Sequence, residues 1–427
     1  MVVGLPIAGP NDSQHENPMQ DRSGFQSFFL GGFECSTHRR RDGRRLDLVH
    51  ATQHDQFAES DYQLLQQHGI SSVREGLRWH LIEAQPQTFD FSSADQIIRA
   101  ARVTRTQVIW DLWHYGWPDD IDIFSAKFVT RFTQFARAAA VRLSQNFDAP
   151  LICPINEISF FSWAGGEAGI FNPFAHNRGD EMKRQLVCAS IAAIAAIRQV
   201  NAAIRICHVD PMINVIAKEP TPTNIAAASA YHDSQFEAYD MITGRRAPEL
   251  GGQDDLVDLL GVNYYIHNQW TYPGEGGSMI VASDPRYRHV RDLLCEYYDR
   301  YRKPMFIAET GIEDDTRPAW LRYMCNEVYG AIAAGVPVQG ICLYPILNHP
   351  GWDDDRHCYN GLFDYADEKG HREVYEPLAC ELARQEEFLD GIRAGQEFID
   401  RRDADVSALD WAAHVMEGRT DESRTEK

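Results

Sequence analysis

Two short apolar runs, each carrying a glutamate at or near its end, constrain this chain more than any other part of its sequence. The first spans Leu151 to Glu157, and the second spans Pro304 to Gly311 and contains Glu309. Short apolar runs bounded by breaker residues are typical of strands buried on both faces, as in a parallel sheet. Barrels and doubly wound sheets place reactive side chains at the carboxyl ends of such strands. If both strands belong to one closed sheet, the two glutamates share one site.

The rest of the chain alternates between strand-like and helix-like segments. Apolar runs predict strands at 27–36, 70–79, 106–113, 151–157, 203–209, 259–265, 304–311 and 338–343. Apolar residues at helical spacing predict helices at 57–68, 95–103, 125–146, 180–200, 234–242, 288–301, 318–334 and 374–394. This repeat is typical of a single α/β fold, the (β/α)8 TIM barrel, and enlarged βα loops account for the length of the chain.

The predicted organisation is one catalytic barrel over residues 25–395 with an extension at each end. Residues 1–24 are polar and contain Pro, Gly and Asn, which predicts a loose N-terminal arm. Residues 396–427 are rich in charge, which predicts a short C-terminal helix followed by a disordered tail.

Charge and cysteine content narrow the functional classes. The formal net charge is −21, whereas phosphate binding needs clustered Lys and Arg, so we expect no nucleic-acid partner. The nine cysteines are an odd number and form no Cys-x-x-Cys pair, which predicts free thiols in a reducing compartment. Neither a disulfide framework nor a metal site is therefore expected.

No segment of the sequence reads as a membrane or targeting signal. The longest apolar stretch, residues 187–197, is too short to span a bilayer. Residues 1–20 lack a basic region followed by an apolar core, so we expect no signal peptide. These features predict a cytoplasmic protein without a membrane partner, and they make no prediction about its oligomeric state.

In the predicted barrel, the strand exits gather polar and aromatic side chains on one face. The exits supply Arg74, Trp79, His114, Trp117, Asn156, Glu157, Asn263, Tyr265, Glu309, Tyr344 and Asn348. Sugar hydroxyls bind carboxylate, amide and imidazole groups, and the C–H faces of a sugar pack on aromatic rings. A pair of carboxylates is the usual machinery for cleaving a glycosidic bond. The set therefore predicts a carbohydrate site without a cofactor.

The order of these motifs resembles the family 1 glycoside hydrolases, the β-glucosidase family among the retaining β-glycosidases of clan A. The resemblance covers about residues 28–365 and rests on Asn156-Glu157, Glu309-Thr310-Gly311, Arg74, Trp79, His114 and Asn263-Tyr264-Tyr265. It implies that Glu157 is the acid/base and Glu309 the nucleophile. It also implies substrate-binding positions for a wider set: Arg74, His114, Asn156, Asn263, Tyr265, Tyr344 and Trp352.

The resemblance implies a two-step displacement that retains the anomeric configuration. Arg74 and the Tyr265 hydroxyl are expected to keep Glu309 ionised, because a nearby cation and a hydrogen bond both favour the charged form. We expect apolar surroundings and a negative neighbour to raise the pKa of Glu157. Retention needs carboxyl groups about 5–5.5 Å apart, and inversion needs about 6.5–9.5 Å.

The chain departs from the family pattern at the first and eighth strand exits. The family carries a Gln after the first strand, where this chain offers Glu34 as a substitute. After the eighth strand, Tyr344 replaces a Trp, and Asp353 is the acid nearest to the expected Glu. No lysine lies between residues 303 and 369, so we expect a β-linked glycoside or oligosaccharide without a phosphate group.

Other interpretations stay open at this stage. Arg74 can instead be an ion-pair partner of Glu75, and His114 or Trp117 can instead be core residues. The arginine-rich loop at 39–45 is either solvated or reaches the leaving-group side of the site. A transglycosidase has the same pair of acids, and a sugar-binding barrel without catalysis is the rival outside enzymes. A Schiff-base aldolase is excluded because no lysine follows a predicted strand.

Overall fold

The computed structural model describes residues 24–273, 278–396, 398–400 and 409–410. The predicted N-terminal arm, apart from residue 24, and most of the predicted C-terminal helix and tail lie outside the described residues.

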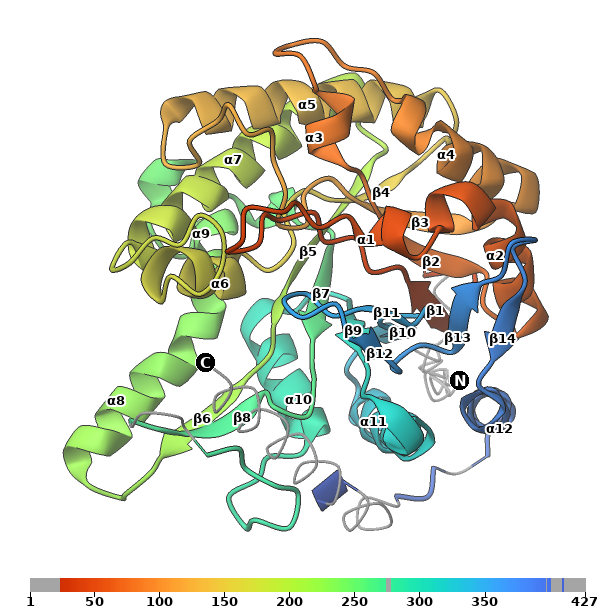
Figure 1. The fold of residues 1–427 in the computed structure, drawn as a ribbon. Coiled ribbons are helices and arrows are strands. Elements are labelled where there is room, and N and C mark those ends of the chain that lie inside the picture. Colours follow the sequence, from red (N-terminus) through yellow and green to blue (C-terminus); the bar gives the residue numbers. More distant parts are fainter. Residues whose placement is uncertain (1–23, 274–277, 397, 401–408, 411–427) are drawn as a thin grey trace, which may run out of the picture.

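Eight parallel strands close into a barrel in the order β1-β10-β9-β7-β5-β4-β3-β2 (Figure 1). The barrel strands are β1 (Phe29–Gly32), β2 (Ser72–Gly76), β3 (Gln107–Asp111), β4 (Leu151–Cys153), β5 (Arg205–Pro211), β7 (Leu259–Asn263), β9 (Met305–Thr310) and β10 (Val338–Leu343). Every one of them lies within, or within two residues of, a segment predicted as a strand. The prediction of a (β/α)8 barrel is confirmed.

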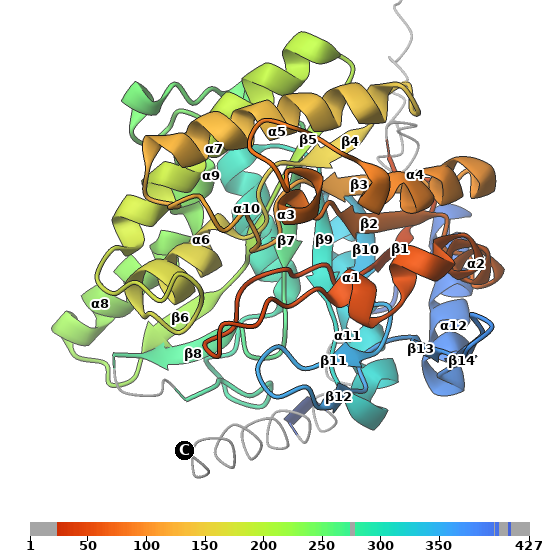
Figure 2. The same cartoon turned by 45° about the horizontal axis from the view of Figure 1, so that its top comes forward.

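Helices surround the strands on the outside of the barrel (Figures 1 and 2). The longer ones are α2 (His54–Gln67), α4 (Ser92–Thr104), α5 (Ala126–Ser144), α7 (Gly179–Val200), α10 (Val290–Tyr301), α11 (Arg317–Ala333) and α12 (Glu376–Arg393). Shorter ones are α1 (Leu48–Ala51), α3 (Trp79–Ile82), α6 (Ile158–Phe161) and α9 (Glu237–Ile242). Among the described residues, no helix is long and apolar enough to cross a membrane.

Several elements in the βα loops were not expected from the sequence. Strands β6 (Asn214–Ala217) and β8 (Gln269–Tyr272) form a small parallel sheet beside α8 (Pro222–Asp233). Two hairpin-like pairs, β11 (His349–Pro350) with β12 (His357–Cys358) and β13 (Phe363–Ala366) with β14 (Arg372–Val374), follow the eighth barrel strand. A π-helix, η1 (Ser162–Glu167), continues directly from α6. These elements enlarge the face on which the strands end.

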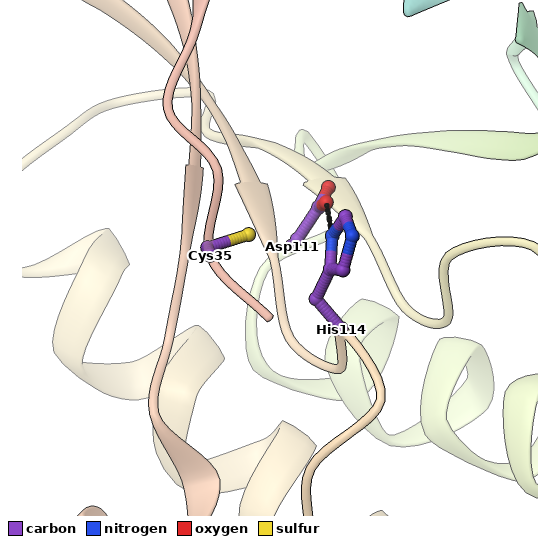
Figure 3. Close-up of side chains that lie close together, drawn as sticks. All are labelled: Cys35, Asp111 and His114. Carbon is purple, nitrogen blue, oxygen red and sulfur yellow. Dashed lines mark hydrogen bonds and ion pairs between the residues drawn. The ribbon is translucent and has the colours of Figure 1, made fainter. Parts of the chain in front are cut away.

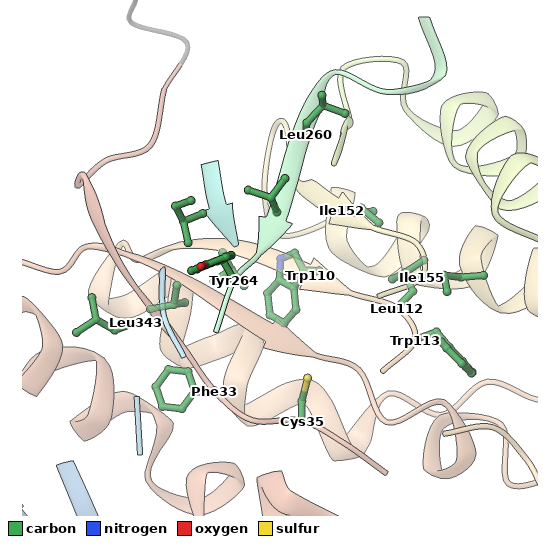
Figure 4. Close-up of a cluster of buried hydrophobic side chains, with 14 of the residues drawn as sticks. Phe33, Cys35, Trp110, Leu112, Trp113, Ile152, Ile155, Leu260, Tyr264 and Leu343 are labelled. Atoms are coloured by element: carbon green, nitrogen blue, oxygen red, sulfur yellow. The ribbon is translucent and has the colours of Figure 1, made fainter. Parts of the chain in front are cut away.

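Two layers of apolar side chains hold the barrel together. Inside it, side chains from seven of the strands form one cluster, which includes Cys153, Cys207 and Cys342. All nine cysteines are free thiols, as predicted. The three cysteines of this cluster pack as small apolar groups. Between strands and helices lies a larger cluster, part of which Figure 4 shows around Trp110 and Trp113.

Two tryptophans at predicted strand exits belong to the core. Trp79 is fully buried and stacks on Phe135 with ring centroids 5.4 Å apart. The indole nitrogen of Trp117 donates to the carbonyl oxygen of Ile121 at 2.9 Å, and its ring packs edge-on against Phe161. For both residues, the interpretation as a sugar platform is therefore replaced by core packing.

Candidate active site

A cavity of about 1560 Å³ opens where the barrel strands end. It is lined by residues at the exits of five different strands: Glu34, His114, Tyr115, Glu157, Tyr265 and Glu309. Trp352 and His349, from the segment after β10, line it as well. The structure thus brings the two predicted acids to one cavity. The closed barrel places them in one cavity although they are 152 residues apart in sequence (309 − 157).

Glu309 lies at the end of β9 and is held by two donors. Arg74 donates from Nη1 to Oε1 at 2.7 Å, and the Tyr265 hydroxyl donates to Oε2 at 2.9 Å. Glu309 is 5% exposed. Burial raises the pKa of Glu309 from its ordinary value, whereas the Arg74 cation lowers it. This carboxylate is therefore the one whose negative charge has a fixed counter-ion.

Arg74 connects Glu309 to the neighbouring strand exits. Its Nε donates to Oδ1 of Asp111 at 3.0 Å, and its Nη2 donates to Oδ1 of Asn156 at 2.6 Å. All these groups are fully buried or nearly so. Glu75 points to the opposite face of β2, as strand alternation requires, and accepts hydrogen bonds from the Tyr62 hydroxyl and His54. The alternative of an Arg74–Glu75 ion pair is therefore wrong.

Glu157 follows β4 and occupies a different electrostatic environment. Asn263 Nδ2 donates to Oε1 at 2.8 Å, and the Tyr115 hydroxyl donates to Oε2. Among the described residues, no lysine or arginine forms an ion pair with Glu157. Burial, and then the negative charge of Glu309, raise the pKa of Glu157 to about 8. This carboxyl group therefore carries a proton at neutral pH.

The backbone is unusual at both Tyr115 and Glu157. Their φ values are 67° and 48°, in the left-handed region that residues other than glycine rarely adopt. Such positions cost about 1–3 kcal/mol each and are enriched at functional sites. The amide of Glu157 is held by the carbonyl oxygen of Val209 at 2.9 Å. The surrounding strands thus fix a strained turn that carries the acid into the cavity.

His114 lines the cavity beside these groups. Its Nδ1 lies 3.1 Å from Oδ2 of Asp111, and its Nε2 lies 3.2 Å from Nδ2 of Asn156. Because Nη2 of Arg74 donates to the Asn156 side-chain oxygen, the Asn156 Nδ2 is the atom that faces His114. Glu34 lies nearby, with Oε1 3.9 Å from Nε2 of His114.

Four of the residues predicted to bind substrate are buried behind the cavity wall. Asn156 and Asn263 are fully buried and contact Arg74 and Glu157 through their side chains. Arg74 is fully buried as well, and Tyr344 is 2% exposed with its ring stacked on that of His114. None of the four lines the cavity. In this structure they position the residues that do.

Three residues of the site were not singled out by the sequence as functional groups. Asp111 is the last residue of β3, and Tyr115 and Glu34 line the cavity. Asp111 could have been found as the acid three residues before His114. Glu34 was noted only as a substitute for a missing glutamine. The role of Tyr115 depends on a left-handed turn that no sequence signal marks.

The arginine-rich loop lies at the rim rather than inside the cavity. Arg39 and Arg45 form ion pairs with Asp119, and Arg40 and Arg44 form ion pairs with Asp355. The described arginines of this loop do not line the cavity. These ion pairs hold the described arginines outside the cavity lining, while Arg41 donates from Nη2 to the carbonyl oxygen of Gly169 at 2.8 Å.

Cys35, Asp111 and His114 have metal-ligand chemistry and lie within 4.8 Å of one another (Figure 3). The charges around them do not fit a metal ion. Both Asp111 oxygens are already bound by Arg74, whose guanidinium is a cation 2.7 Å away. Burial raises the pKa of the Cys35 thiol to about 11, so sulfur is neutral there. Asp111 is better described as a hydrogen-bonding support for His114, with Nδ1 of the imidazole 3.1 Å from its Oδ2.

Comparison with solved structures identifies the architecture. A β-glucosidase from Thermotoga maritima in complex with glucoimidazole superimposes with a TM-score of 0.69 at 16% identity, covering 84% of this chain and 98% of that one. An enzyme from Alicyclobacillus herbarius gives 0.69 at 18% identity, covering 86% and 98%. A structure described as a family 1 β-glucosidase from Thermotoga maritima gives 0.69 at 16% identity, covering 85% and 98%. The chain has the fold of the family 1 β-glucosidases.

Sequence comparisons are weaker but point the same way. No family model matches the chain. A β-galactosidase from Sulfolobus acidocaldarius is 28% identical over 120 residues, which is 22% of this chain and 24% of that protein. One from Saccharolobus solfataricus is 28% identical over 157 residues, 30% of this chain and 32% of that protein. The matches thus span a quarter to a third of these relatives. The resemblance to family 1 is confirmed at the level of the fold.

Proposed function

We propose that the chain is an exo-acting, β-glucosidase-like retaining β-glycosidase, which hydrolyses an O-glycosidic bond by double displacement. The observation that carries the proposal is the asymmetry of the two acids. Glu309 has the Arg74 cation at 2.7 Å, whereas Glu157 has neutral hydrogen-bond partners and a pKa raised to about 8. One carboxyl group is suited to attack and the other to donate a proton, which is the division of labour that glycoside cleavage needs.

In the first step, a Glu309 oxygen attacks the anomeric carbon while Glu157 donates its proton to the departing oxygen. The bond from carbon to the leaving group breaks as the ester to Glu309 forms. Arg74 and Tyr265 hold the two Glu309 oxygens, so the attacking group is oriented before substrate arrives.

In the second step, the ionised Glu157 removes a proton from water, and that water attacks the anomeric carbon. The ester to Glu309 breaks, and Glu157 regains its proton. Asn263 and Tyr115 hold the Glu157 oxygens throughout, so the same carboxyl group can serve as acid and then as base. His114 and Trp352, which both line the cavity, are proposed to contact the sugar that is transferred.

The proposed substrate is a β-linked glycoside or oligosaccharide. Support comes from the similar β-glucosidase of Thermotoga maritima, which has been solved in complex with glucoimidazole and with deoxynojirimycin. A transglycosidase has the same acids and differs in passing the glycosyl group to a sugar instead of water. A non-catalytic sugar-binding barrel has no need for one acid held by the Arg74 cation beside a second acid with neutral partners. Cytoplasmic location stays a prediction.

An aryl β-glycoside panel that varies the 2-, 4- and 6-positions tests the proposal through release of the phenol. Glu309→Gln is expected to lose roughly four orders of magnitude or more, as enzymes do without their nucleophile. Glu157→Gln is expected to lose about 10²–10⁴-fold on poor leaving groups and far less on good ones, which need no protonation. Glu181→Gln is the matched control, because Glu181 is an exposed acid on the same cavity wall. Wild-type rates in both dyad variants would contradict the assignment.

A further inference from the structure

A third carboxyl group, that of Glu34, shares the cavity with Glu157 and Glu309. Glu34 lies two residues beyond the end of β1 and is 7% exposed. A double displacement uses two carboxyl groups, so it gives this third one no task. A buried charge costs free energy unless it is paired, which makes the partner of Glu34 an open question of the site.

The hydrogen bonds of Glu34 occupy one of its two carboxylate oxygens. Oε1 accepts from the amide of Ser36 at 2.9 Å and from the hydroxyl of Ser36 at 2.6 Å, which fixes the carboxylate in a tight turn. None of the described residues donates a hydrogen bond to Oε2. The imidazole of His114 lies near, with Nε2 3.9 Å from Oε1, but no described lysine or arginine forms an ion pair with Glu34. Oε2 is therefore left for a ligand.

The charged groups around Glu34 do not balance. Burial lowers the pKa of His114, but neighbouring groups, Asp111 and Glu34 among them, raise it well above its ordinary value, so the imidazole is a cation at neutral pH. Arg74 is the second cation, and it pairs with both Asp111 and Glu309. Three carboxylates thus share two cations. One negative charge stays uncompensated, and Glu34 is the acid without a cation at hydrogen-bonding distance.

The rest of the cavity has the same sign. Ten aspartates and glutamates line it, against three lysines and arginines. Each of these three cations already pairs with an acid of the lining: Arg178 with Glu181, Lys183 with Glu237, and Arg356 with Glu313. A cleft lined by one sign of charge concentrates ligands of the opposite sign. The cavity therefore favours a cationic substrate and disfavours an anionic one.

An ammonium group is the ligand chemistry that completes this arrangement. It offers N–H donors to Oε2 and supplies the missing positive charge, and hydrogen bonds between charged partners are about twice as strong as neutral ones. A sugar hydroxyl can donate to Oε2 as well, but it leaves the charge uncompensated.

The position of Glu34 places this group on the transferred sugar. Burial is the main cause that raises the pKa of Glu309, and the negative charge of Glu34 raises it as well. Glu34 is therefore close enough to act on the carboxylate that would hold the transferred sugar. An ammonium group bound at Glu34 offsets that negative charge, and so it favours the ionised form in which Glu309 attacks.

We propose that Glu34 selects a transferred sugar that carries an ammonium group, so that the preferred substrate is a β-glycoside of an amino sugar. This inference rests on the proposed glycosidase function and adds the charge of the sugar that is cleaved off. Oε2 of Glu34 accepts from the ammonium group, while Ser36 holds Oε1.

The test measures kcat/KM for 4-nitrophenyl β-glucoside and for analogues in which one hydroxyl, at position 2, 3, 4 or 6, is replaced by an amino group. At pH 6 the amines are protonated, because even an α-amino group titrates at about 7.7–8.0. The wild type is expected to prefer at least one amino analogue over the parent glucoside by roughly tenfold. In Glu34→Gln this preference should fall by roughly tenfold or more, because the amide keeps an oxygen for Ser36 but removes the charge.

Two controls isolate Glu34 from the general charge of the cavity. Glu181→Gln removes a negative charge from an exposed position of the same lining, and its preference should equal that of the wild type. An aryl β-glucoside whose phenol carries an aminomethyl group places the cation on the leaving group instead. A preference confined to that compound, a wild type that favours the parent over every amino sugar, or an unchanged preference in Glu34→Gln would each overturn the proposal.

If no glycoside is turned over, calorimetric binding of the methyl β-glycosides of the same sugars to the wild type and to Glu34→Gln decides the matter. Tighter binding of an amino sugar that is lost in Glu34→Gln supports the role of Glu34 while rejecting the hydrolase. Equal binding of the parent and amino sugars, or no binding of either, overturns that role.

Discussion

The hydroxyl of Tyr115 donates a hydrogen bond to Oε2 of Glu157, and both residues hold a left-handed backbone. The contact joins the exits of β3 and β4, which are neighbours in the barrel. It stabilises the ionised form of Glu157, whereas burial and Glu309 stabilise the protonated form. Tyr115 therefore moderates the pKa of the group that we propose as the acid/base.

Replacing Tyr115 by Phe is expected to raise the pKa of Glu157. The hydroxyl lowers this pKa by bonding the carboxylate, so its removal favours the protonated acid. The alkaline limb of a kcat/KM–pH profile should then move to higher pH. A limb that stays in place or moves to lower pH would show that Tyr115 does not act through Glu157.

In the wild type, the alkaline limb itself should fall near pH 8, where Glu157 loses its proton. With a good leaving group, Glu157→Gln should lack this limb, since the amide has no proton to lose in that range. The measurement is the same profile recorded for both proteins. A limb that survives the substitution would assign the titration to another group.

The raised pKa of Glu157 should also cost stability. An unfolded glutamate titrates near 4.5 and the folded one near 8, so the folded protein binds the extra proton between these values. The bound proton contributes its full stabilisation below the pKa of the unfolded state. This stabilisation is lost as the pH rises through the pKa of the folded state, and the loss is on the order of 4 kcal/mol around pH 8. In thermal unfolding, the Tm of Glu157→Gln should therefore rise relative to the Tm of the wild type between pH 4 and pH 8. A constant difference in Tm across that range would contradict the pKa shift.

Arg74→Lys should move the acidic limb of the kcat/KM–pH profile upward. Lysine keeps the charge but cannot bridge Glu309, Asp111 and Asn156 as the guanidinium does. The pKa of Glu309 then rises, and ionised Glu309 is lost at a higher pH. Arg78→Lys, at a buried arginine that pairs with Asp47 and Asp55, is the control and should leave the limb in place.

Much of this architecture could be predicted from the sequence. A strand buried on both faces reads as a short apolar run, so β9 and the polar groups that follow it were found from local pattern alone. The convergence of Glu157 and Glu309 followed from the closure of the barrel. Neither inference needed any long-range contact to be known.

The remainder depends on contacts that leave no local signal. α8 has no apolar stripe that would predict a helix, and its start signals, the Thr221 cap and Pro222 in the first turn, do not by themselves predict one. Arg74 and Glu75 are adjacent in sequence, but alternation along β2 sends one to Glu309 and the other to His54. Nothing in the sequence singled out Tyr115, because its contact with Glu157 exists only in the folded turn.

Glu309 as the nucleophile, paired with Glu157 as the acid/base, is the central assignment. Incubation with a 2-deoxy-2-fluoro β-glycoside carrying a good leaving group slows the second step and should leave the sugar attached to the enzyme. Peptide mass spectrometry is expected to find one fluoroglycosyl group, on the peptide containing Glu309, and none in Glu309→Gln. A label on Glu157 or on any other residue, or steady turnover of substrate without a trapped sugar, would contradict the double displacement.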